Sequence, residues 1–252
     1  MDAPALETRD LTIRFGGHVA VDKVSCSFRS GSLTAIVGPN GAGKTTYFNL
    51  ISGQLKASAG TVLLKGEDVT GLPVSARTHR GMGRAFQLTN LFPNLTVAEN
   101  VRLAVQSRAR VGLDLVSLWS DRRALIEKAE AMLARVRLAD RRDAAVASLS
   151  HGDQRKLEVA LMLALEPDIF MFDEPTAGMS VDEVPTILEL IQEIKARANA
   201  TILLVEHKMD VVRSLADRII VLHNGQLVAD GLPAEVIASA VVQEAYLGVA
   251  AA

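Results

Sequence analysis

The sequence predicts an α/β fold that is built on a parallel sheet and interrupted by an inserted helical segment. Short apolar runs of strand length alternate along the chain with stretches of helical periodicity, which is typical of strands joined by helices. Between about residues 88 and 148 the chain is rich in alanine, arginine and capping residues, so helices alone are expected there. The expected strands of the sheet are 33–37, 169–172, 201–205 and 218–222, and the expected helices are 46–51, 150–165 and 184–194.

Alternating apolar residues predict further strands near both ends of the chain. Two strands are expected within the first thirty residues, and residues 61–64 predict a third ahead of a turn at 65–68. Towards the other end, Asn224-Gly225 between apolar runs is a strong signal for a tight hairpin that continues into residues 226–228.

Two capping boxes predict where helices begin. Thr96 and Glu99 have the spacing at which each side chain bonds the backbone N–H of the other residue, so a helix should start there. Ser180 and Glu183 repeat the pattern before helix 184–194, although Pro185 leaves the first turn of that helix open.

Composition limits the class of protein. With 252 residues, 49% hydrophobic and 22% charged, the chain is long enough for one large domain or two small ones with a sizeable core. A formal net charge of −2 argues against a nucleic-acid binder that relies on a basic face. The single cysteine, Cys26, cannot form an internal disulfide, so we expect a reducing compartment and a small buried strand residue here.

The sequence shows no targeting or membrane-spanning segment. The N-terminus lacks the basic start and apolar stretch of a signal peptide. The longest purely apolar run, residues 159–165, is too short to span a bilayer. We therefore expect a cytoplasmic protein that reaches a membrane only through another protein.

A glycine-rich loop is the most informative motif. Residues 38–45 match the phosphate-binding pattern G-x-x-x-x-G-K-[ST] at every fixed position, between an expected strand and an expected helix. The glycines let backbone N–H groups point at an anion, and the helix N-terminus adds its positive dipole end. Lys44 can reach the β- and γ-phosphates, and the Thr45 hydroxyl can bind Mg²⁺. The residues expected to bind a nucleoside triphosphate are Gly38, Pro39, Asn40, Gly41, Ala42, Gly43, Lys44, Thr45 and Thr46.

A pair of carboxylates follows the strand at 169–172. Asp173 and Glu174 would lie at its carboxyl end, which is where ligands bind in open α/β sheets. Asp173 is expected to hold Mg²⁺ through water, and Glu174 to polarise an attacking water. A strand that merely ends in a polar turn is the alternative, which a phosphate-binding loop in the same chain disfavours.

Further motifs resemble those of ATP-binding-cassette (ABC) ATPases. Residues 149–154, Leu-Ser-His-Gly-Asp-Gln, resemble the family signature, which is usually Leu-Ser-Gly-Gly-Gln. Gln87 after residues 84–86, residues 177–180 after the carboxylates, and His207 after strand 201–205 follow in family order. The resemblance covers essentially the whole chain. It implies a P-loop NTPase (RecA-like) core with an N-terminal antiparallel β subdomain and an inserted α-helical subdomain.

The same resemblance implies one ABC ATPase domain over residues 1–252. Within it, 1–87 and 155–252 would form the ATP-binding core, and 88–154 the helical signature subdomain.

The resemblance also implies roles for single residues. Phe15, with Val21 nearby, matches the aromatic residue that stacks on adenine. Gln87 matches the glutamine that contacts Mg²⁺ and the attacking water and senses the transporter partner. Glu174 matches the catalytic base and His207 the histidine that contacts the γ-phosphate. The expected metal ligands are accordingly Thr45, Gln87 and Asp173.

In this family two subunits dock head to tail. Ser150, His151 and Gly152 of one subunit would cap the γ-phosphate bound by the other, since a helix N-terminus with a serine hydroxyl is an anion site. The chain departs from the family pattern at His151, usually glycine, at Asp153, usually glutamine, and at Ser180, usually aspartate. None of these departures removes a group that performs chemistry, so an active ATPase that uses ATP and Mg²⁺ is expected.

Local features favour a transporter subunit. Residues 84–87, 95–100 and 244–248, together with the extra stretch 111–120 that carries Trp119, are similar to the ATPases of bacterial branched-chain amino acid importers. The lipopolysaccharide-export ATPase is the nearest alternative. A soluble ATPase acting on DNA or ribosomes is disfavoured by charge and missing insertions. An inactive ATP-binding module is disfavoured because the residues expected to perform the chemistry are all present.

The implied partners are a second ATPase subunit, transmembrane permease subunits and, indirectly, a periplasmic solute-binding protein, with no nucleic acid. The protein would then lie on the inner face of the cell membrane. We expect the permease to contact apolar residues near Gln87, namely Leu88, Leu91, Phe92 and Leu95, with burial in the core as the alternative. The cargo is not determined by this chain.

Overall fold

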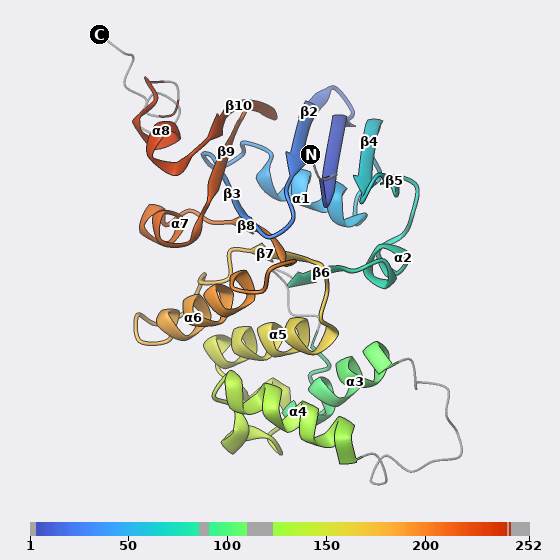
Figure 1. The fold of residues 1–252 in the computed structure, drawn as a ribbon, viewed down its shortest axis with the longest axis vertical. Coiled ribbons are helices and arrows are strands. Elements are labelled where there is room, and N and C mark those ends of the chain that lie inside the picture. Colours follow the sequence, from blue (N-terminus) through green and yellow to red (C-terminus); the bar gives the residue numbers. More distant parts are fainter. Residues whose placement is uncertain (1–3, 86–90, 110–122, 241, 243–252) are drawn as a thin grey trace. The chain divides into compact units, whose positions relative to one another are not determined.

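The computed structural model describes residues 4–85, 91–109, 123–240 and 242 (Figure 1). Contacts divide the chain into two compact units. Unit 1 comprises Met1–Arg84, Asp168–Glu174 and Ile194–Ala252, and unit 2 comprises Ala85–Pro167 and Pro175–Glu193.

Unit 1 is built on the expected parallel sheet, which has six strands in the order β10-β9-β3-β8-β7-β6. β3 pairs in parallel with β8 and β9, β7 pairs in parallel with β8, and β9 pairs antiparallel with β10. Every residue of β3, β7 and β8 is buried, which explains their continuous apolar runs. The bounds are β3 Leu33–Val37, β6 Met82–Ala85, β7 Ile169–Asp173, β8 Thr201–Val205, β9 Arg218–His223 and β10 Gln226–Gly231.

The strand directions determine where functional groups can meet. Because β3, β7 and β8 are mutually parallel, their carboxyl ends lie at one edge of the sheet. The phosphate-binding loop follows β3, the carboxylate pair ends β7, and His207 follows β8. One sheet edge therefore collects the three motifs that lie far apart in the sequence.

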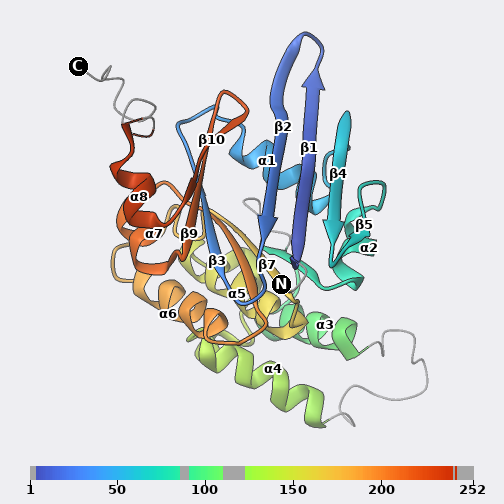
Figure 2. The same cartoon turned by 45° about the horizontal axis from the view of Figure 1, so that its top comes forward.

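A second sheet in unit 1 is antiparallel, with the strand order β2-β1-β4-β5 (Figure 2). β1 is Leu6–Phe15, β2 His18–Phe28, β4 Ala59–Leu64 and β5 Glu67–Asp68. β1 pairs antiparallel with β2 and β4, and all three lie where the alternation of apolar residues predicted strands.

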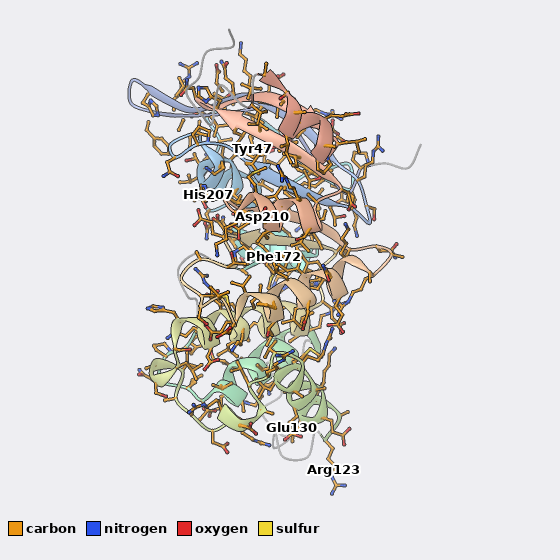
Figure 3. All side chains as sticks on the ribbon, turned by 90° about the vertical axis from the view of Figure 1, so that its left-hand side faces the viewer. Tyr47, Arg123, Glu130, Phe172, His207 and Asp210 are labelled. Atoms are coloured by element: carbon orange, nitrogen blue, oxygen red, sulfur yellow. The ribbon has the colours of Figure 1, made fainter. Side chains whose placement is uncertain are left out.

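The main core of unit 1 gathers side chains of both sheets and of α1, Lys44–Ser52. Tyr47 of α1, labelled in Figure 3, is fully buried, and its hydroxyl lies 2.8 Å from Thr8 Oγ1. Burial raises the pKa of Tyr47 well above its usual value. Cys26 is 5% exposed in β2, which confirms the small buried strand residue expected there. Other members of this core are Leu6, Leu11, Phe28, Phe48, Ile51, Met171, Leu203 and Ile220.

A smaller cluster in unit 1 packs α7, Met209–Leu215, and α8, Pro233–Ala238, on residues of β3 and β9. The turn between β9 and β10 is the predicted hairpin. Asn224 and Gly225 have φ angles of 48° and 77°, which are the left-handed values that a tight turn of this kind requires.

In unit 2 the described residues of the stretch from about 88 to 148 form helices and turns, as the composition predicted. α3, Val97–Ala109, α4, Arg123–Arg135, and α5, His151–Leu165, all contact one another. Two short 3₁₀ turns lie at Ala139–Arg141 and Val146–Ser148. Arg135 Nη2 lies 2.7 Å from Glu193 Oε2, which links α4 to the part of α6, Val184–Lys195, that belongs to this unit.

The two expected capping boxes have different outcomes. The first is confirmed, because Thr96 N–H donates to Glu99 Oε2 at 2.8 Å and Glu99 N–H donates to Thr96 Oγ1 at 3.1 Å. The second is half formed. Ser180 N–H donates to Glu183 Oε2 at 3.2 Å, as a capping box requires, but the Ser180 hydroxyl donates to the same oxygen at 3.0 Å. Helix α6 begins after Glu183, and Val184 N–H donates to Ser180 O at 3.3 Å.

Within the described ranges, none of the helices combines the length and the apolar character that crossing a membrane needs.

Arg77 of α2, Val74–His79, is the largest fully buried side chain and closes the end of α1. Its guanidinium donates to the carbonyl oxygens of Leu50, Ile51, Leu72 and Thr70 at 2.6–3.1 Å. The last carbonyls of a helix have no partner within the helix, so this side chain satisfies groups that burial would otherwise leave unbonded.

We therefore expect Arg77→Met to lower the free energy of unfolding by about 2–4 kcal/mol, because several carbonyls lose their donors at once. Urea denaturation measures this difference. Arg80→Met is the matched control, since the Arg80 side chain is 45% exposed and lies 4.0 Å from Glu67. Equal stability of the two variants would contradict the structural role of Arg77.

Candidate functional site

The phosphate-binding loop between β3 and α1 depends on its glycines. Gly38, Gly41 and Gly43 have φ angles of 151°, 80° and 95°, which other residues rarely adopt. A Cβ atom on Gly38 would lie 2.1 Å from the carbonyl oxygen of Leu222, and one on Gly43 would lie 2.4 Å from that of Ala20. Both the conformation and the close approach of neighbouring backbone therefore require glycine at positions 38 and 43.

Backbone hydrogen bonds join the phosphate-binding loop to the β9–β10 turn and, through that turn, to β2. Gly225 N–H, in the β9–β10 turn, donates to Ala42 O at 3.0 Å, and Asp22 N–H of β2 donates to Gly225 O at 2.8 Å. The hairpin turn thus connects the loop to the antiparallel sheet.

Lys44 is 6% exposed, and its ammonium is held by the loop itself. Nζ donates to the carbonyl oxygens of Gly38 at 2.7 Å and Pro39 at 2.9 Å. Burial lowers the pKa of Lys44, while the nearby carboxylates Glu174 and Asp173 act in the opposite direction. The ammonium lies at a pocket of about 260 Å³, which is lined by His18, Ala20, Asn40, Gly41, Ala42, Gly43, Lys44, Thr45, Thr46, Glu174 and His207.

Asp173 at the end of β7 is fully buried and paired with Arg84 of β6. Arg84 Nη2 lies 3.0 Å from Asp173 Oδ2, and the two side chains are 5% and 0% exposed. Arg84 Nη1 also donates to Ser52 Oγ at 2.7 Å and Gln54 Oε1 at 2.9 Å, beside the end of α1. The guanidinium carbon lies 5.0 Å from the centre of the Phe48 ring. In the sequence, Arg84 stands out only as part of the importer-like segment 84–87, which did not predict its pairing with Asp173.

Glu174 lies beside Asp173 in the sequence but points into the pocket. Its φ angle of 50° is left-handed, and its N–H donates to Val205 O at 2.9 Å. This kink at the strand end separates the two carboxylates, so that one is buried and the other lines the pocket. Glu174 Oε1 lies 2.8 Å from Nε2 of the His207 ring. The backbone N–H of His207 donates to Glu206 Oε2 at 2.7 Å. A lysine, a carboxylate and an imidazole thus converge on the pocket.

Comparison with protein-family models identifies the family. A model described as "ABC transporter" matches residues 21–177, which include the phosphate-binding loop, the signature-like segment and the carboxylate pair. The chain belongs to the ABC transporter ATPase family. A second model, described as "Branched-chain amino acid ATP-binding cassette transporter", matches residues 226–252 of this ABC ATPase.

Named relatives match this ABC ATPase over nearly its whole length. The high-affinity branched-chain amino acid transport ATP-binding protein LivG of Salmonella typhimurium is 38% identical over 253 residues, 98% of this chain and 99% of its own. The corresponding protein BraF of Pseudomonas aeruginosa is 36% identical over 255 residues, with the same coverage.

Solved structures show the same fold. The ADP conformation of MJ1267, an ATP-binding cassette of an ABC transporter, has a TM-score of 0.81 at 30% identity and covers 97% of this chain and 99% of its own. A nucleotide-free ATP-binding cassette from an ABC transporter has a TM-score of 0.82 at 29% identity, with the same coverage. The expected α/β P-loop NTPase fold with its antiparallel sheet is confirmed.

The two residues expected near the adenine differ in their exposure to solvent. Phe15 is 51% exposed at the end of β1. Val21 is fully buried in the core, and its neighbour Ala20 lines the pocket together with His18. Successive side chains of a strand point to opposite faces. In β2, Val21 therefore lies in the core while the adjacent Ala20 lines the pocket. Gln87 lies outside the described residues.

The signature-like segment belongs to unit 2 of this ABC ATPase. Ser150 caps α5, because its hydroxyl oxygen accepts a hydrogen bond from Asp153 N–H at 3.1 Å. His151 is exposed and Gly152 is buried.

The donor set near the pocket fits a small, hard cation. Thr45 and Asp173 supply oxygen atoms, the ligands that Mg²⁺ prefers. Among the described residues no group of three or more His, Cys, Asp or Glu side chains could hold a metal ion by itself.

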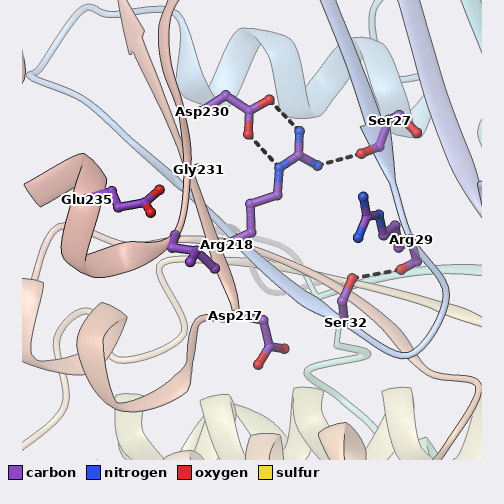
Figure 4. Close-up of a pocket in the computed structure, with 9 residues that line it drawn as sticks. Ser27, Arg29, Ser32, Asp217, Arg218, Asp230, Gly231 and Glu235 are labelled. Atoms are coloured by element: carbon purple, nitrogen blue, oxygen red, sulfur yellow. Dashed lines mark hydrogen bonds and ion pairs between the residues drawn. The ribbon is translucent and has the colours of Figure 1, made fainter.

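A second pocket in unit 1, of about 530 Å³, contains a structural ion pair (Figure 4). Arg218 of β9 donates from Nε to Asp230 Oδ1 at 2.6 Å and makes a second bond to the same carboxylate. It also donates to the carbonyl of Ser27 and lies over the Phe28 ring. Arg218 thereby ties β9 and β10 to β2.

Lys44→Ala is expected to lower the affinity for MgATP by about tenfold or more, because no other ammonium lies in the described pocket to face the β- and γ-phosphates. Isothermal titration calorimetry measures the affinity. Lys65→Ala is the control, since Lys65 is 58% exposed and pairs with Asp168. Unchanged affinity together with unchanged turnover in Lys44→Ala would remove Lys44 from the site.

Proposed function

We propose that this chain is the ATP-hydrolysing subunit of a transporter that imports branched-chain amino acids. The observation that carries the proposal is the end-to-end match, at 38% identity, to a protein named for high-affinity branched-chain amino acid transport. The match of residues 226–252 to a branched-chain amino acid transporter model supports the same substrate class.

We propose that ATP binds with its phosphates at the loop 38–45. Lys44 would leave the carbonyl oxygens of Gly38 and Pro39 and contact the β- and γ-phosphates. Thr45 and Asp173, with Gln87, would hold Mg²⁺, which neutralises charge developing on the transferred phosphoryl group. Phe15 would stack on the adenine.

Glu174 is the proposed general base. It lines the pocket, where it can accept a proton from an attacking water, whereas Asp173 is buried and paired with Arg84. His207, at 2.8 Å from Glu174, would orient this carboxylate and contact the γ-phosphate, and Gln87 would complete the catalytic set.

We further propose that two such ATPase subunits dock head to tail on the permease. Ser150, His151 and Gly152 of each would face the γ-phosphate held by the other, because the N-terminus of α5 offers N–H groups and a serine hydroxyl. The expected helical subdomain, 88–154, would present this segment. Bound to the permease, the protein would lie at the inner face of the membrane, with a solute-binding protein acting on the far side.

The alternatives considered from the sequence are not favoured. The lipopolysaccharide-export system lacks support, because the full-length relatives named above are amino acid transport proteins. A role on DNA or ribosomes is disfavoured because the net charge of −2 differs from the basic charge that is typical of proteins that bind nucleic acid.

Glu174→Gln is expected to bind MgATP, to hydrolyse it about 10²–10⁴-fold more slowly, and to accumulate as an ATP-bound dimer. The amide keeps the size of the side chain but cannot accept the proton. Single-turnover hydrolysis and size-exclusion chromatography with ATP measure the two effects. Glu189→Gln, at a side chain that is 64% exposed, is the control. Full turnover in Glu174→Gln would exclude Glu174 as the base.

The apolar residues that follow Gln87 in the sequence differ in exposure, and this difference reduces the number of candidates for the proposed permease contact. Phe92 is 56% exposed, Leu91 is 8% exposed, Leu95 is half-buried, and Leu88 lies outside the described residues. A charged residue at Leu91 would be buried and would damage the fold. Phe92 is therefore the residue that can reach a partner.

Phe92→Asp is expected to reduce transport at least tenfold in vesicles that contain the permease, while the ATPase activity of the isolated subunit stays within about twofold, because the exposed ring makes few contacts in the subunit. Leu232→Asp is the control, since Leu232 is 58% exposed in another part of the chain. Equal transport by both variants would place the contact elsewhere.

A further inference from the structure

Two segments of unit 2 that are distant in the sequence are joined by one carboxylate. The first is the start of α5, which carries Ser150, Gly152 and Asp153. The second is the short segment before α6, which carries Ser180 and Glu183. Glu183 contacts both of them.

The two oxygens of Glu183 have different partners. Oε2 accepts hydrogen bonds from Ser180 N–H at 3.2 Å and from the Ser180 hydroxyl at 3.0 Å. Oε1 lies 3.5 Å from Lys156 Nζ, which also donates to Asp153 Oδ1 at 2.9 Å. The side chains of Lys156, Asp153 and Glu183 are 12%, 22% and 26% exposed, so water screens these charges only in part.

Gly152 provides the space for this carboxylate. A Cβ atom on Gly152 would lie 2.2 Å from Glu183 Oε1 and 2.3 Å from Oε2. The carboxylate therefore packs directly on the backbone of the segment that carries Ser150. The hydrogen bonds from Ser180 and the charge of Lys156 hold the pKa of Glu183 below its usual value.

We propose that Glu183 is a positioning residue that fixes the Ser180 segment to the start of α5, so that each subunit presents both segments to its partner as one rigid surface. Lys156 completes the connection by bridging Glu183 and Asp153. This inference rests on the proposed head-to-tail dimer. Losing the connection lets the two segments move separately, and the ATP-bound dimer then forms at an entropic cost.

The connection accounts for two of the three departures from the family signature. Asp153, in place of glutamine, supplies the carboxylate that Lys156 binds. Ser180, in place of aspartate, donates to Glu183, whereas an aspartate there would bring a second negative charge beside the same oxygen. In this chain, restoring the usual aspartate at position 180 is therefore unfavourable.

The test uses the Glu174→Gln protein as the parent and measures ATP-dependent dimerisation by analytical ultracentrifugation. Ser180→Asp is expected to weaken dimerisation about tenfold, because a charge-assisted hydrogen bond is replaced by repulsion. Adding Glu183→Gln removes the repulsion, so Ser180→Asp/Glu183→Gln is expected to recover to within about twofold of Glu183→Gln alone.

Lys156 is tested in the same way. Lys156→Met is expected to weaken dimerisation about three- to fivefold, and Lys156→Arg to stay close to the parent, since the charge is retained. Lys128→Met is the matched control, because Lys128 forms a 2.8 Å ion pair with Glu166 within the same unit. Affinity of the monomer for MgATP, which is expected to stay unchanged, and thermal unfolding are measured for every variant, and the unfolding data show how much of each effect is a loss of stability.

Recovery in the double variant shows that Ser180→Asp acts through its repulsion with Glu183, and the unfolding measurement separates an effect on dimerisation from a loss of stability. The inference is overturned if the parent dimerises and Ser180→Asp dimerises equally well, or if the double variant is no better than Ser180→Asp. If the parent does not dimerise with ATP, the proposed dimer itself is wrong and the inference falls with it. The behaviour of the parent therefore distinguishes failure of the proposed dimer from failure of the role of Glu183 alone.

Discussion

The close approach of three backbone segments at the start of α1 is the constraint on which the rest of the structure depends. The loop at 38–43 packs against Leu222 and Ala20 at distances that leave no room for a Cβ atom on Gly38 or Gly43. The hairpin turn at Gly225 bonds the loop on one side and β2 on the other. These contacts join the parallel sheet, the antiparallel sheet and α1, so the loop is held in a fixed shape before any ligand binds.

Charged groups around this loop are arranged in pairs. The ammonium of Lys44 is bonded to loop carbonyls, Asp173 to Arg84, and Glu174 to His207. A triphosphate would take over the Lys44 contacts, since it offers a full negative charge instead of carbonyl dipoles. The left-handed backbone at Glu174 keeps the two adjacent carboxylates in different environments. A buried carboxylate suits metal binding, and a pocket carboxylate suits proton transfer.

The positions that sequence reasoning missed show what local patterns leave out. Alternation identified β2 as a strand, but it did not say which of its residues line the pocket, which are His18 and Ala20, and which lie in the core, as Val21 does. Arg84 belongs to the importer-like segment 84–87, but that motif did not indicate its role, because its partners Ser52, Gln54 and Asp173 are brought together only by the fold. The Ser180–Glu183 spacing indicated the start of α6, but it did not indicate that Glu183 also contacts Lys156 of α5.

The sequence by itself determined the fold class, the phosphate-binding loop, the carboxylate pair and the capping of α3. Each of these depends on the conformational preferences of neighbouring residues: glycine at positive φ, apolar runs in buried strands, and side chains that bond a nearby N–H. Only the tertiary structure decided the partners of Asp173, Glu174 and Glu183. The partners Arg84, His207 and Lys156 lie 89, 33 and 27 residues away along the chain. Their contacts follow from strand order and helix packing, which no local preference encodes.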